Sequence, residues 1–207
     1  VITDARVEDI TAEHGSFSHV TLSDGRQLSA EMLVVGIGVT PKTALAEAAG
    51  IETGNGILVD AGMQTSMAGI YAIGDGALQR DSAYGIRIES VHNAQDSAER
   101  AAAAINGHAP PAEQAPWFWS EQFGLRLQSA GIVPIAADDV MCLRRPGKRA
   151  DGFSIWSFRG DELCAVEAVG DPAAYMLGKT CLEKGLSPIH DAVTDAAFDM
   201  KAFVAAK

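Results

Sequence analysis

The sequence predicts an α/β fold over roughly its first half and a small α+β module over the remainder. Short apolar runs that end in glycine alternate with helical patterns up to about residue 107. Beyond residues 108–116, strand-like runs follow one another and helical patterns close the chain. Alternating strands and helices are typical of a parallel α/β sheet, whereas strands followed by helices are typical of α+β folds. Residues 108–116 contain three prolines and are predicted to be a linker.

The composition is that of a globular protein and excludes several function classes. The 207 residues are 47% hydrophobic and 21% charged, and no apolar run approaches the ~20 residues that span a bilayer. The formal net charge of −11 disfavours nucleic acid and anionic membranes as partners. Cys142, Cys164 and Cys181 are widely spaced, which argues against a disulfide framework, a metal site and a dithiol redox centre. We expect a protein of the reducing cytoplasm.

The chain begins at Val1, without an initiator Met and without a basic-then-apolar leader. It enters directly on a pattern that is typical of the middle of a domain. We therefore expect a portion of a longer, non-secreted protein.

The first 41 residues predict two half-buried strands, a hairpin and one buried strand. Residues 6–11 and 17–22 alternate loosely, and Asp24-Gly25 favours a tight primed turn after them. The continuous apolar run at residues 32–35 is expected to be buried on both faces. Gly36 and Gly38 at its tip would let the backbone approach a flat or phosphorylated ligand, or simply form a tight turn.

Two shorter elements follow. Residues 42–49 have helical spacing and stop at Gly50, a suitable residue to follow a helix. Asn55-Gly56 then turns the chain into a strand at residues 57–60.

The stretch at residues 65–75 is predicted to be a polar turn, a short buried strand and a Gly-Asp pair. In open α/β sheets ligands bind beyond the carboxyl ends of strands, where the Asp75 carboxylate could accept hydrogen bonds from cofactor hydroxyls. Gly74 would allow the ligand to approach the backbone. We expect residues 76–85 to form a loop over the cofactor.

A long helix is predicted at residues 91–106, with Ser90 as its N-cap and Gly107 as its stop. Its apolar face would be formed by Val91, Ala94, Ala98, Ala101, Ala102 and Ile105. The free N–H groups at Ser90 to Asn93 could stabilise an anion such as the pyrimidine edge of a reduced flavin. The alternative is a capped helix that only packs on the sheet.

The second module opens with three aromatic residues, Trp117, Phe118 and Trp119. Strands are predicted at residues 125–132, 139–145, 153–159 and 163–169. Asp171-Pro172 would start a helix that runs to about residue 182, and a last helix is predicted at residues 196–205.

Four segments occur in an order that resembles one enzyme family. They are the glycine loop at residues 36–41, the motif at 65–75, the helix start at 87–91 and the aromatic segment at 116–120. Together they resemble the C-terminal half of bacterial NADH-dependent ferredoxin reductases, which use FAD and NAD and feed a [2Fe–2S] ferredoxin that serves an oxygenase. The resemblance implies that residues 1–38 end the NAD-binding domain, that 39–112 form the second segment of the FAD-binding domain, and that 113–207 form the C-terminal domain.

One departure from the family is large. The two Gly-x-Gly-x-x-Gly fingerprints that hold the pyrophosphates of FAD and NAD are absent from these residues. We therefore expect the missing N-terminal half to be a partner and this chain alone to hold FAD poorly.

The resemblance also implies roles for individual residues, none of them catalytic. Asp75, beside Gly74, would hold the ribityl chain of FAD, and Glu89 would lie near the nicotinamide or flavin edge. Helix-start N–H groups, after Ser90, would face the pyrimidine ring. They belong to Val91 and His92, whose side chain is expected to have a structural or hydrogen-bonding role.

The remaining implied contacts concern NAD and the ferredoxin. Gly36 and Gly38 would line the nicotinamide approach. Trp117 and Trp119 would lie between flavin and ferredoxin, with Trp119 nearer the electron path, or they would only pack in a core.

A basic cluster is a candidate docking patch for an acidic ferredoxin. Arg144, Arg145, Lys148 and Arg149 form it, and a solvated hairpin tip is the alternative. Two other functions remain open: another pyridine-nucleotide flavoprotein, such as an NADH oxidase or a rubredoxin reductase, and a flavin-free interaction module.

Overall fold

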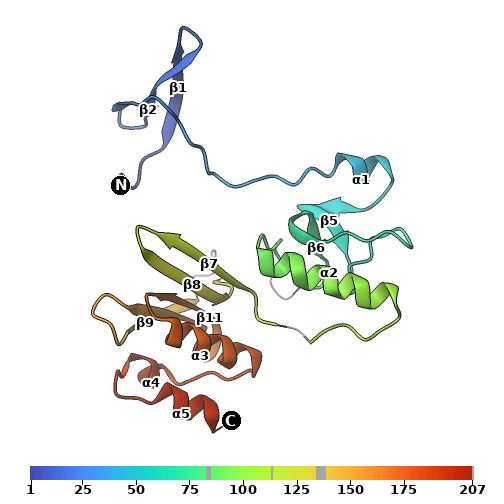
Figure 1. Ribbon diagram of the computed structural model, residues 1–207, viewed down its shortest axis with the longest axis vertical. Coiled ribbons are helices and arrows are strands. Elements are labelled where there is room, and N and C mark those ends of the chain that lie inside the picture. The colour runs from blue at the N-terminus through green and yellow to red at the C-terminus, as the bar shows by residue number, and fades with distance from the viewer. Residues whose placement is uncertain (83–84, 113, 134–138, 207) are drawn as a thin grey trace. The chain divides into compact units, whose positions relative to one another are not determined.

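The computed structural model describes residues 1–82, 85–112, 114–133 and 139–206. The chain divides into two compact units, Val1–Thr40 and Pro41–Lys207 (Figure 1). Two residues of the predicted cofactor loop, 83–84, and residue 113 of the predicted linker lie outside the described residues.

The first unit contains a three-stranded antiparallel sheet of β1 (Val7–Glu13), β2 (Ser16–Leu22) and β3 (Gln27–Ser29). A tight turn at His14-Gly15 connects β1 to β2. Both of its central residues are left-handed, with φ of 51° and 79°. The predicted hairpin at Asp24-Gly25 is confirmed by the β2–β3 pairing. Its turn is not of the primed type, because only Gly25 has a positive φ there and the loop is longer, closed by the Leu22 N–H bond to Arg26 O.

The buried strand predicted at residues 32–35 is wrong. Residues 30–43 form neither helix nor strand, and Met32 and Val34 are 76% and 84% exposed. A strand that is buried on both faces needs neighbouring strands and covering helices. None pairs with this run among the residues that the structure describes.

The first part of the second unit is a small α/β layer. Its strands β4 (Thr53–Gly54), β5 (Gly56–Val59) and β6 (Ala77–Gln79) form one sheet in which β5 and β6 are parallel. Two helices accompany it, α1 (Ala44–Ala48) and α2 (Val91–Ile105). The core of this layer consists of Val59, Met63, Ala77 and Ala101.

Both helices end as the sequence predicts. Gly50 and Gly107 have φ of 74° and 68°, and each donates its N–H back to the helix, to Glu47 O and Ala104 O. The packing face of α2 differs from the prediction, because Ser97 and Ala101 are buried whereas Val91 and Ile105 are exposed.

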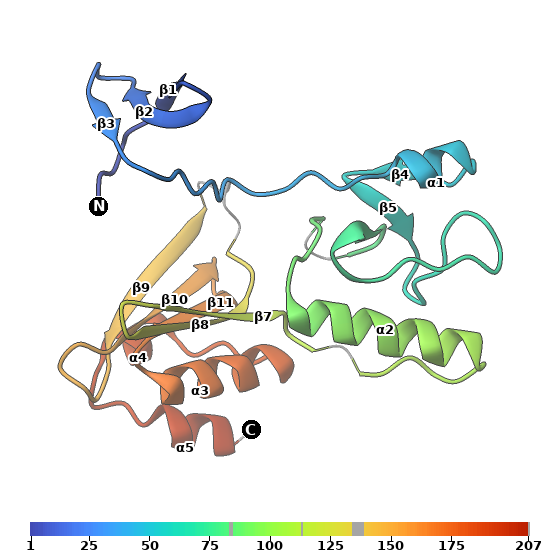
Figure 2. The ribbon, with the colours of Figure 1, turned by 45° about the horizontal axis from the view of Figure 1, so that its top comes forward.

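The C-terminal part contains an antiparallel sheet in the order β7-β8-β11-β10-β9. Its strands are β7 (Trp117–Gln122), β8 (Leu125–Gly131), β9 (Val140–Pro146), β10 (Phe153–Arg159) and β11 (Glu162–Val169). The helices α3 (Pro172–Glu183), α4 (His190–Thr194) and α5 (Met200–Ala205) gather on one face of this sheet (Figures 1 and 2). The predicted strands and the helix at Asp171-Pro172 are thus confirmed, with ends that shift by one or two residues.

The main core lies between this sheet and its helices. Trp156, Phe158 and Val166 are fully buried from the sheet side, and Cys181 and Val193 from the helix side. Trp156 donates its indole N–H to Ser154 Oγ at 3.0 Å, so its polar atom is satisfied inside the core.

The predicted basic patch of four residues is wrong in one member, Arg145, whose guanidinium is bound within the protein. Its guanidinium donates to four backbone carbonyls, at 2.7–3.0 Å, two in α4 and two in the segment between α4 and α5. Those acceptors are the O atoms of Ala192, Val193, Asp195 and Phe198. The predicted helix at residues 196–205 is accordingly shorter and starts at Met200, where Asp199 Oδ1 accepts from the Ala202 N–H.

Gly131, in β8, lies close to β11 and to the residue that precedes β7. Its φ is 76°, its N–H donates to Pro116 O at 2.8 Å, and it pairs with Ala165 of β11. A Cβ at this position would lie 2.1 Å from Cys164 O, so only glycine fits without moving backbone.

Candidate cofactor site

Asp75 lies in a single 3₁₀ turn, η1 (Gly74–Gly76), which leads into β6. The short buried strand predicted before it is wrong. Residues 70–73 make only an isolated bridge from Tyr71 to Gln64, and Ile70 and Ile73 are exposed. A strand needs a ladder of pairs along a neighbouring strand, and here residues 63–65 supply only a short contact, with the Thr65 N–H donating to Ile70 O and the Ala72 N–H to Met63 O. Asp75 therefore precedes a strand instead of following one.

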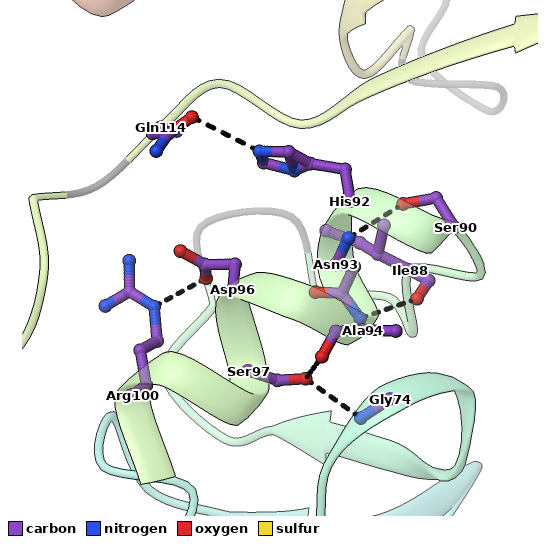
Figure 3. A network of polar contacts seen from close by, with 10 residues as sticks. All are labelled: Gly74, Ile88, Ser90, His92, Asn93, Ala94, Asp96, Ser97, Arg100 and Gln114. Carbon is purple, nitrogen blue, oxygen red and sulfur yellow. Dashed lines mark hydrogen bonds and ion pairs between the residues drawn. The ribbon is translucent and has the colours of Figure 1, made fainter. Parts of the chain in front are cut away.

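Gly74 has the open backbone that the prediction requires. Its φ is 68°, and the nearest atom to a Cβ built there is Ala94 Cβ, at 3.9 Å. Its N–H donates to Ser97 Oγ at 2.9 Å, and Ser97 in turn donates to Ala94 O (Figure 3). Ser97 is only 3% exposed, so α2 holds this turn through a buried hydrogen bond.

Arg87 connects the Asp75 turn to Glu89. Its side chain is 5% exposed and reaches three groups: Nη1 donates to Asp75 O at 2.5 Å, Nε to Asn55 O at 3.0 Å, and Nη2 lies 2.6 Å from Glu89 Oε1. The Asp75 carboxylate itself belongs to an exposed residue. Arg87 thus fixes the backbone of one predicted cofactor residue and the side chain of another.

The start of α2 is capped as predicted. Ser90 Oγ accepts from the Asn93 N–H at 3.1 Å, and Asn93 Nδ2 donates to Ile88 O at 2.8 Å (Figure 3). The first intrahelical bond runs from the Ala94 N–H to Ser90 O. The N–H groups of Val91 and His92 come before it and have no intrahelical acceptor, which leaves them for a ligand.

His92 meets the beginning of the C-terminal sheet. Its Nε2 lies 3.2 Å from Gln114 Oε1, and its ring centroid lies 5.2 Å from that of Trp117. Trp117 is in turn 5.5 Å from Trp119, which is 39% exposed. Burial lowers the pKa of His92, and the nearby Asp96 carboxylate opposes that shift.

Two cavities flank the contact between His92 and Gln114. One has a volume of about 330 Å³ and is also lined by Asn93 and Arg100. The other has a volume of about 340 Å³ and is also lined by Trp117 and Lys179.

The structure brings eight of the ten predicted site residues into one unit. Gly74, Asp75, Glu89, Ser90, Val91, His92, Trp117 and Trp119 belong to Pro41–Lys207, whereas Gly36 and Gly38 belong to Val1–Thr40 and are exposed. The predicted linker runs beside α2 at Gln114 and carries no helix or strand in its described residues.

Sequence reasoning missed the residues that support the site, namely Arg87, Ser97 and Gln114. Two of these residues could have been found from the sequence. Arg87 and Glu89 are opposite charges two apart in an extended stretch, and Ser97 is a polar residue on the alanine-rich face of α2. Nothing local marks Gln114.

The described residues fit one end of FAD. The open Gly74 turn, the exposed Asp75 carboxylate and the α2 start offer acceptors and donors for a ribityl chain and a flavin ring. No described segment contains a glycine-rich turn for the pyrophosphate. Within the described residues no group of three or more His, Cys, Asp or Glu could hold a metal ion, and no helix is long and apolar enough to cross a membrane.

Two family models match the chain. Residues 1–98 match the pyridine nucleotide-disulphide oxidoreductase family, and residues 117–204 match the reductase C-terminal family. The two matches have the order that the sequence motifs predict.

Similar proteins match nearly the whole chain. A probable ferredoxin reductase of Castellaniella defragrans, CtmF, is 38% identical over 86% of this chain and 44% of its own length. The ferredoxin reductase for the CYP199A2 system of Rhodopseudomonas palustris is 36% identical, with a TM-score of 0.87 over 97% of this chain and 49% of that one. Putidaredoxin reductase, in its covalent complex with putidaredoxin, is 32% identical, with the same TM-score over 98% and 49%. This chain therefore spans about half the length of the relatives it matches.

Proposed function

Since this chain is similar along nearly its whole length to about half of a ferredoxin reductase, we propose that it forms the C-terminal half of an FAD-dependent reductase. The complete enzyme would pass electrons from NADH to a ferredoxin of the [2Fe–2S] type in the cytoplasm. One observation carries the proposal: the Asp75 turn, the α2 start and the paired tryptophans occur in one unit, in a chain that matches both family models in order.

Each residue has a role in binding or orienting FAD. The Asp75 carboxylate accepts hydrogen bonds from ribityl hydroxyls, and the absence of a side chain at Gly74 leaves room for them. The N–H groups of Val91 and His92, after the Ser90 cap, donate to the pyrimidine edge, where the helix dipole favours negative charge. FAD, when bound, supplies the step from a two-electron donor to a one-electron acceptor.

Glu89 faces the nicotinamide or flavin edge in this proposal. Arg87 holds its carboxylate at 2.6 Å, so the side chain cannot rotate freely toward a ligand. The guanidinium also offsets the negative charge of Glu89, which would otherwise oppose the build-up of charge on a flavin.

The domain boundaries follow the same proposal. Residues 1–38 end an NAD-binding domain, with Gly36 and Gly38 lining the nicotinamide approach. Residues 39–112 belong to the FAD-binding domain and 113–207 form the C-terminal domain. The phosphate-binding turns of both cofactors must come from residues other than these 207.

The ferredoxin would dock where Trp119 is exposed, at the outer end of the Trp117–Trp119 pair. Of the predicted basic patch, Arg144, Lys148 and Arg149 remain exposed and available for electrostatic steering. Arg145 is excluded from that role because its guanidinium is engaged by four carbonyls.

A reconstitution experiment tests the proposal. The chain, expressed with any coding sequence that precedes Val1, is incubated with FAD, and bound flavin is measured by its absorption near 450 nm, an approximate property of the cofactor. We expect bound FAD that NADH bleaches, and reduction of a [2Fe–2S] ferredoxin faster than of a rubredoxin. Asp75→Ala should release flavin, and Gln95→Ala, on an exposed part of α2, should retain it.

The absence of phosphate fingerprints favours one other function, a flavin-free interaction module. Under that alternative no FAD is bound even when the preceding coding sequence is present. Full flavin retention by Asp75→Ala would also count against the proposed site.

A further inference from the structure

His92 occupies a position that the binding of FAD does not explain. Its backbone N–H belongs to the proposed flavin site, but its side chain lies against the linker and β7 (Figure 3). Electron transfer through a flavin to a ferredoxin needs no proton acceptor on this side chain. The imidazole must therefore be explained by the groups it touches.

The imidazole begins a series of three rings. It contacts Trp117 at 5.2 Å with an interplanar angle of 54°, and Trp117 contacts Trp119 at 5.5 Å with an angle of 31°. Such separations are those of aromatic pairs that attract one another. The series runs from the first turn of α2 to the exposed ring of Trp119.

The hydrogen bond from His92 to Gln114 adds a second attachment on the linker side. Two open pockets, of about 330 and 340 Å³, both have His92 and Gln114 in their walls, so this contact separates two solvent-accessible spaces at the junction. A side chain that bridges two parts across such space has a large share in fixing their separation.

We propose that His92 is a positioning residue, which clamps the start of α2 to the first strand of the C-terminal sheet and thereby sets the place of the Trp117–Trp119 pair. The clamp is a property of this chain alone. Its consequence for electron transfer rests on the proposed function, because it requires a flavin at the start of α2 and a ferredoxin at Trp119.

Burial and the charged groups around His92 set the pH at which its ring is protonated. Asp96 and Glu99 face it from α2, and Lys179 and Glu183 face it from α3; Gln114 on the linker is neutral. Lys179 pairs with Glu183 at 2.8 Å and Asp96 with Arg100 at 2.6 Å, so each acid has a basic partner or lies at the surface. Because burial lowers the pKa of His92, the ring should stay neutral at pH 6.5 and be protonated only below it. Gln114 Oε1 accepts from Nε2 in both states, so protonation places a charge beside Trp117 without breaking the hydrogen bond.

Tryptophan fluorescence tests the clamp without any cofactor. An imidazolium quenches an adjacent indole, and of the three tryptophans Trp156 is buried and hydrogen-bonded elsewhere. We expect emission of the 207-residue chain to fall through one transition with a midpoint below pH 6.5, and the transition to be absent from His92→Gln. The matched control is His108→Gln, at an exposed residue beyond α2, which should titrate like the unaltered chain.

A second measurement uses the complete reductase. Removing the ring in His92→Ala should lower ferredoxin reduction at saturating ferredoxin about tenfold, as expected when reacting groups are slightly misplaced. His92→Phe keeps a ring against Trp117 and should recover most of that rate, which a loss of folding would not do. The KM for ferredoxin should change less than kcat.

The outcomes separate the clamp from the proposed function. A fluorescence transition that survives in His92→Gln, or that is absent from the unaltered chain, overturns the clamp. A transition lost only in His92→Gln, in a protein that reduces no ferredoxin, supports the clamp and rejects the proposed function. Equal rates in His92→Ala and His92→Phe would overturn the positioning role.

Discussion

The two parts of the Pro41–Lys207 unit are built in different ways. The C-terminal sheet buries a cluster that includes Trp156, Phe158 and Val166 under its helices, and its strands are seven or eight residues long apart from the six-residue β7. The α/β layer before it has one small cluster, of four buried residues, and strands of two to four residues. The first is stabilised by apolar packing, and the second largely by side chains that bind backbone.

This difference places function and stability in separate regions. The α/β layer carries Gly74, Asp75 and Glu89. Arg87 and Ser97 hold these residues in place through hydrogen bonds and an ion pair. The well-packed sheet carries Trp117 and Trp119 at its β7 edge. Ligand sites commonly lie in regions of low local stability, which a cofactor can order when it binds.

The largest expected effect is at Arg145, and it tests whether the sheet is self-supporting. Arg145→Ala removes the donors to four carbonyls and should lower the free energy of unfolding by about 3 kcal/mol, because three part-buried carbonyls and one exposed carbonyl lose a charged partner. Urea unfolding followed by Trp156 fluorescence measures it. The matched control is Arg144→Ala, which loses a cation–π contact with Phe153 worth about 0.5–1 kcal/mol. Equal losses would contradict the role of Arg145.

The second largest effect, that of Arg87→Gln, should be a loss of stability confined to the α/β layer. Arg87→Gln breaks two bonds to carbonyls and the pair with Glu89, and should cost about 2–3 kcal/mol locally. Hydrogen exchange at residues 55–57 and 74–76 should accelerate, while the Trp156 transition stays in place. Glu89→Gln, at a residue that is partly exposed, should cost less than about 1 kcal/mol. A shift of the Trp156 transition in Arg87→Gln would show that the two regions unfold together.

Alkaline pH should lower the stability of the C-terminal sheet and its helices, where Cys181 is buried. Burial raises the pKa of the Cys181 thiol to about 11 from 9.0, so the folded state favours the neutral thiol. The stability from this thiol is complete below pH 9 and is lost as the pH rises from 9 toward 11, by about 2–3 kcal/mol. In urea unfolding, the free energy of unfolding of Cys181→Ala should therefore fall less between pH 9 and pH 11 than that of the unaltered protein, by the same amount. Parallel pH profiles for the two proteins would contradict the prediction.

The smallest effect should come from Ser97. Ser97→Ala leaves the Gly74 N–H without its acceptor, which costs about 1 kcal/mol, and the better helix propensity of alanine offsets part of that loss. Hydrogen exchange of the Gly74 amide should rise several-fold. Gln95→Ala, on the exposed side of the same helix, should leave that amide unchanged. An unchanged exchange rate in Ser97→Ala would mean that α2 does not hold the turn.

The sequence predicted most of the elements whose signals are local. Gly50 and Gly107 end helices, Ser90 caps α2, and four of the five strands of the C-terminal sheet appear where apolar runs alternate with polar turns, whereas β7 was expected only as an aromatic segment. Such features depend on a few neighbouring residues. This explains why they could be read without knowledge of distant contacts.

The failures concern residues whose state depends on partners far away in sequence. Residues 32–35 and 70–73 are apolar enough for buried strands, yet no described strand pairs with them. Arg145 resembled a surface charge because its four carbonyl acceptors lie about fifty residues further along the chain. Of the predicted site, the backbone positions at Gly74 and Ser90 were readable, whereas the contact between His92 and Gln114 was not.

Gly131 determines where the β7–β8 hairpin lies, and with it the positions of Trp117 and Trp119. Among the described residues, the β7–β8 hairpin pairs with the rest of the sheet along the β8–β11 border alone, and Gly131 lies at the end of that border beside Cys164. A side chain there would push the hairpin from β11 and carry Trp117 and Trp119 with it as one body. The distance between the aromatic pair and the Trp156 core therefore depends on a position that has no side chain at all.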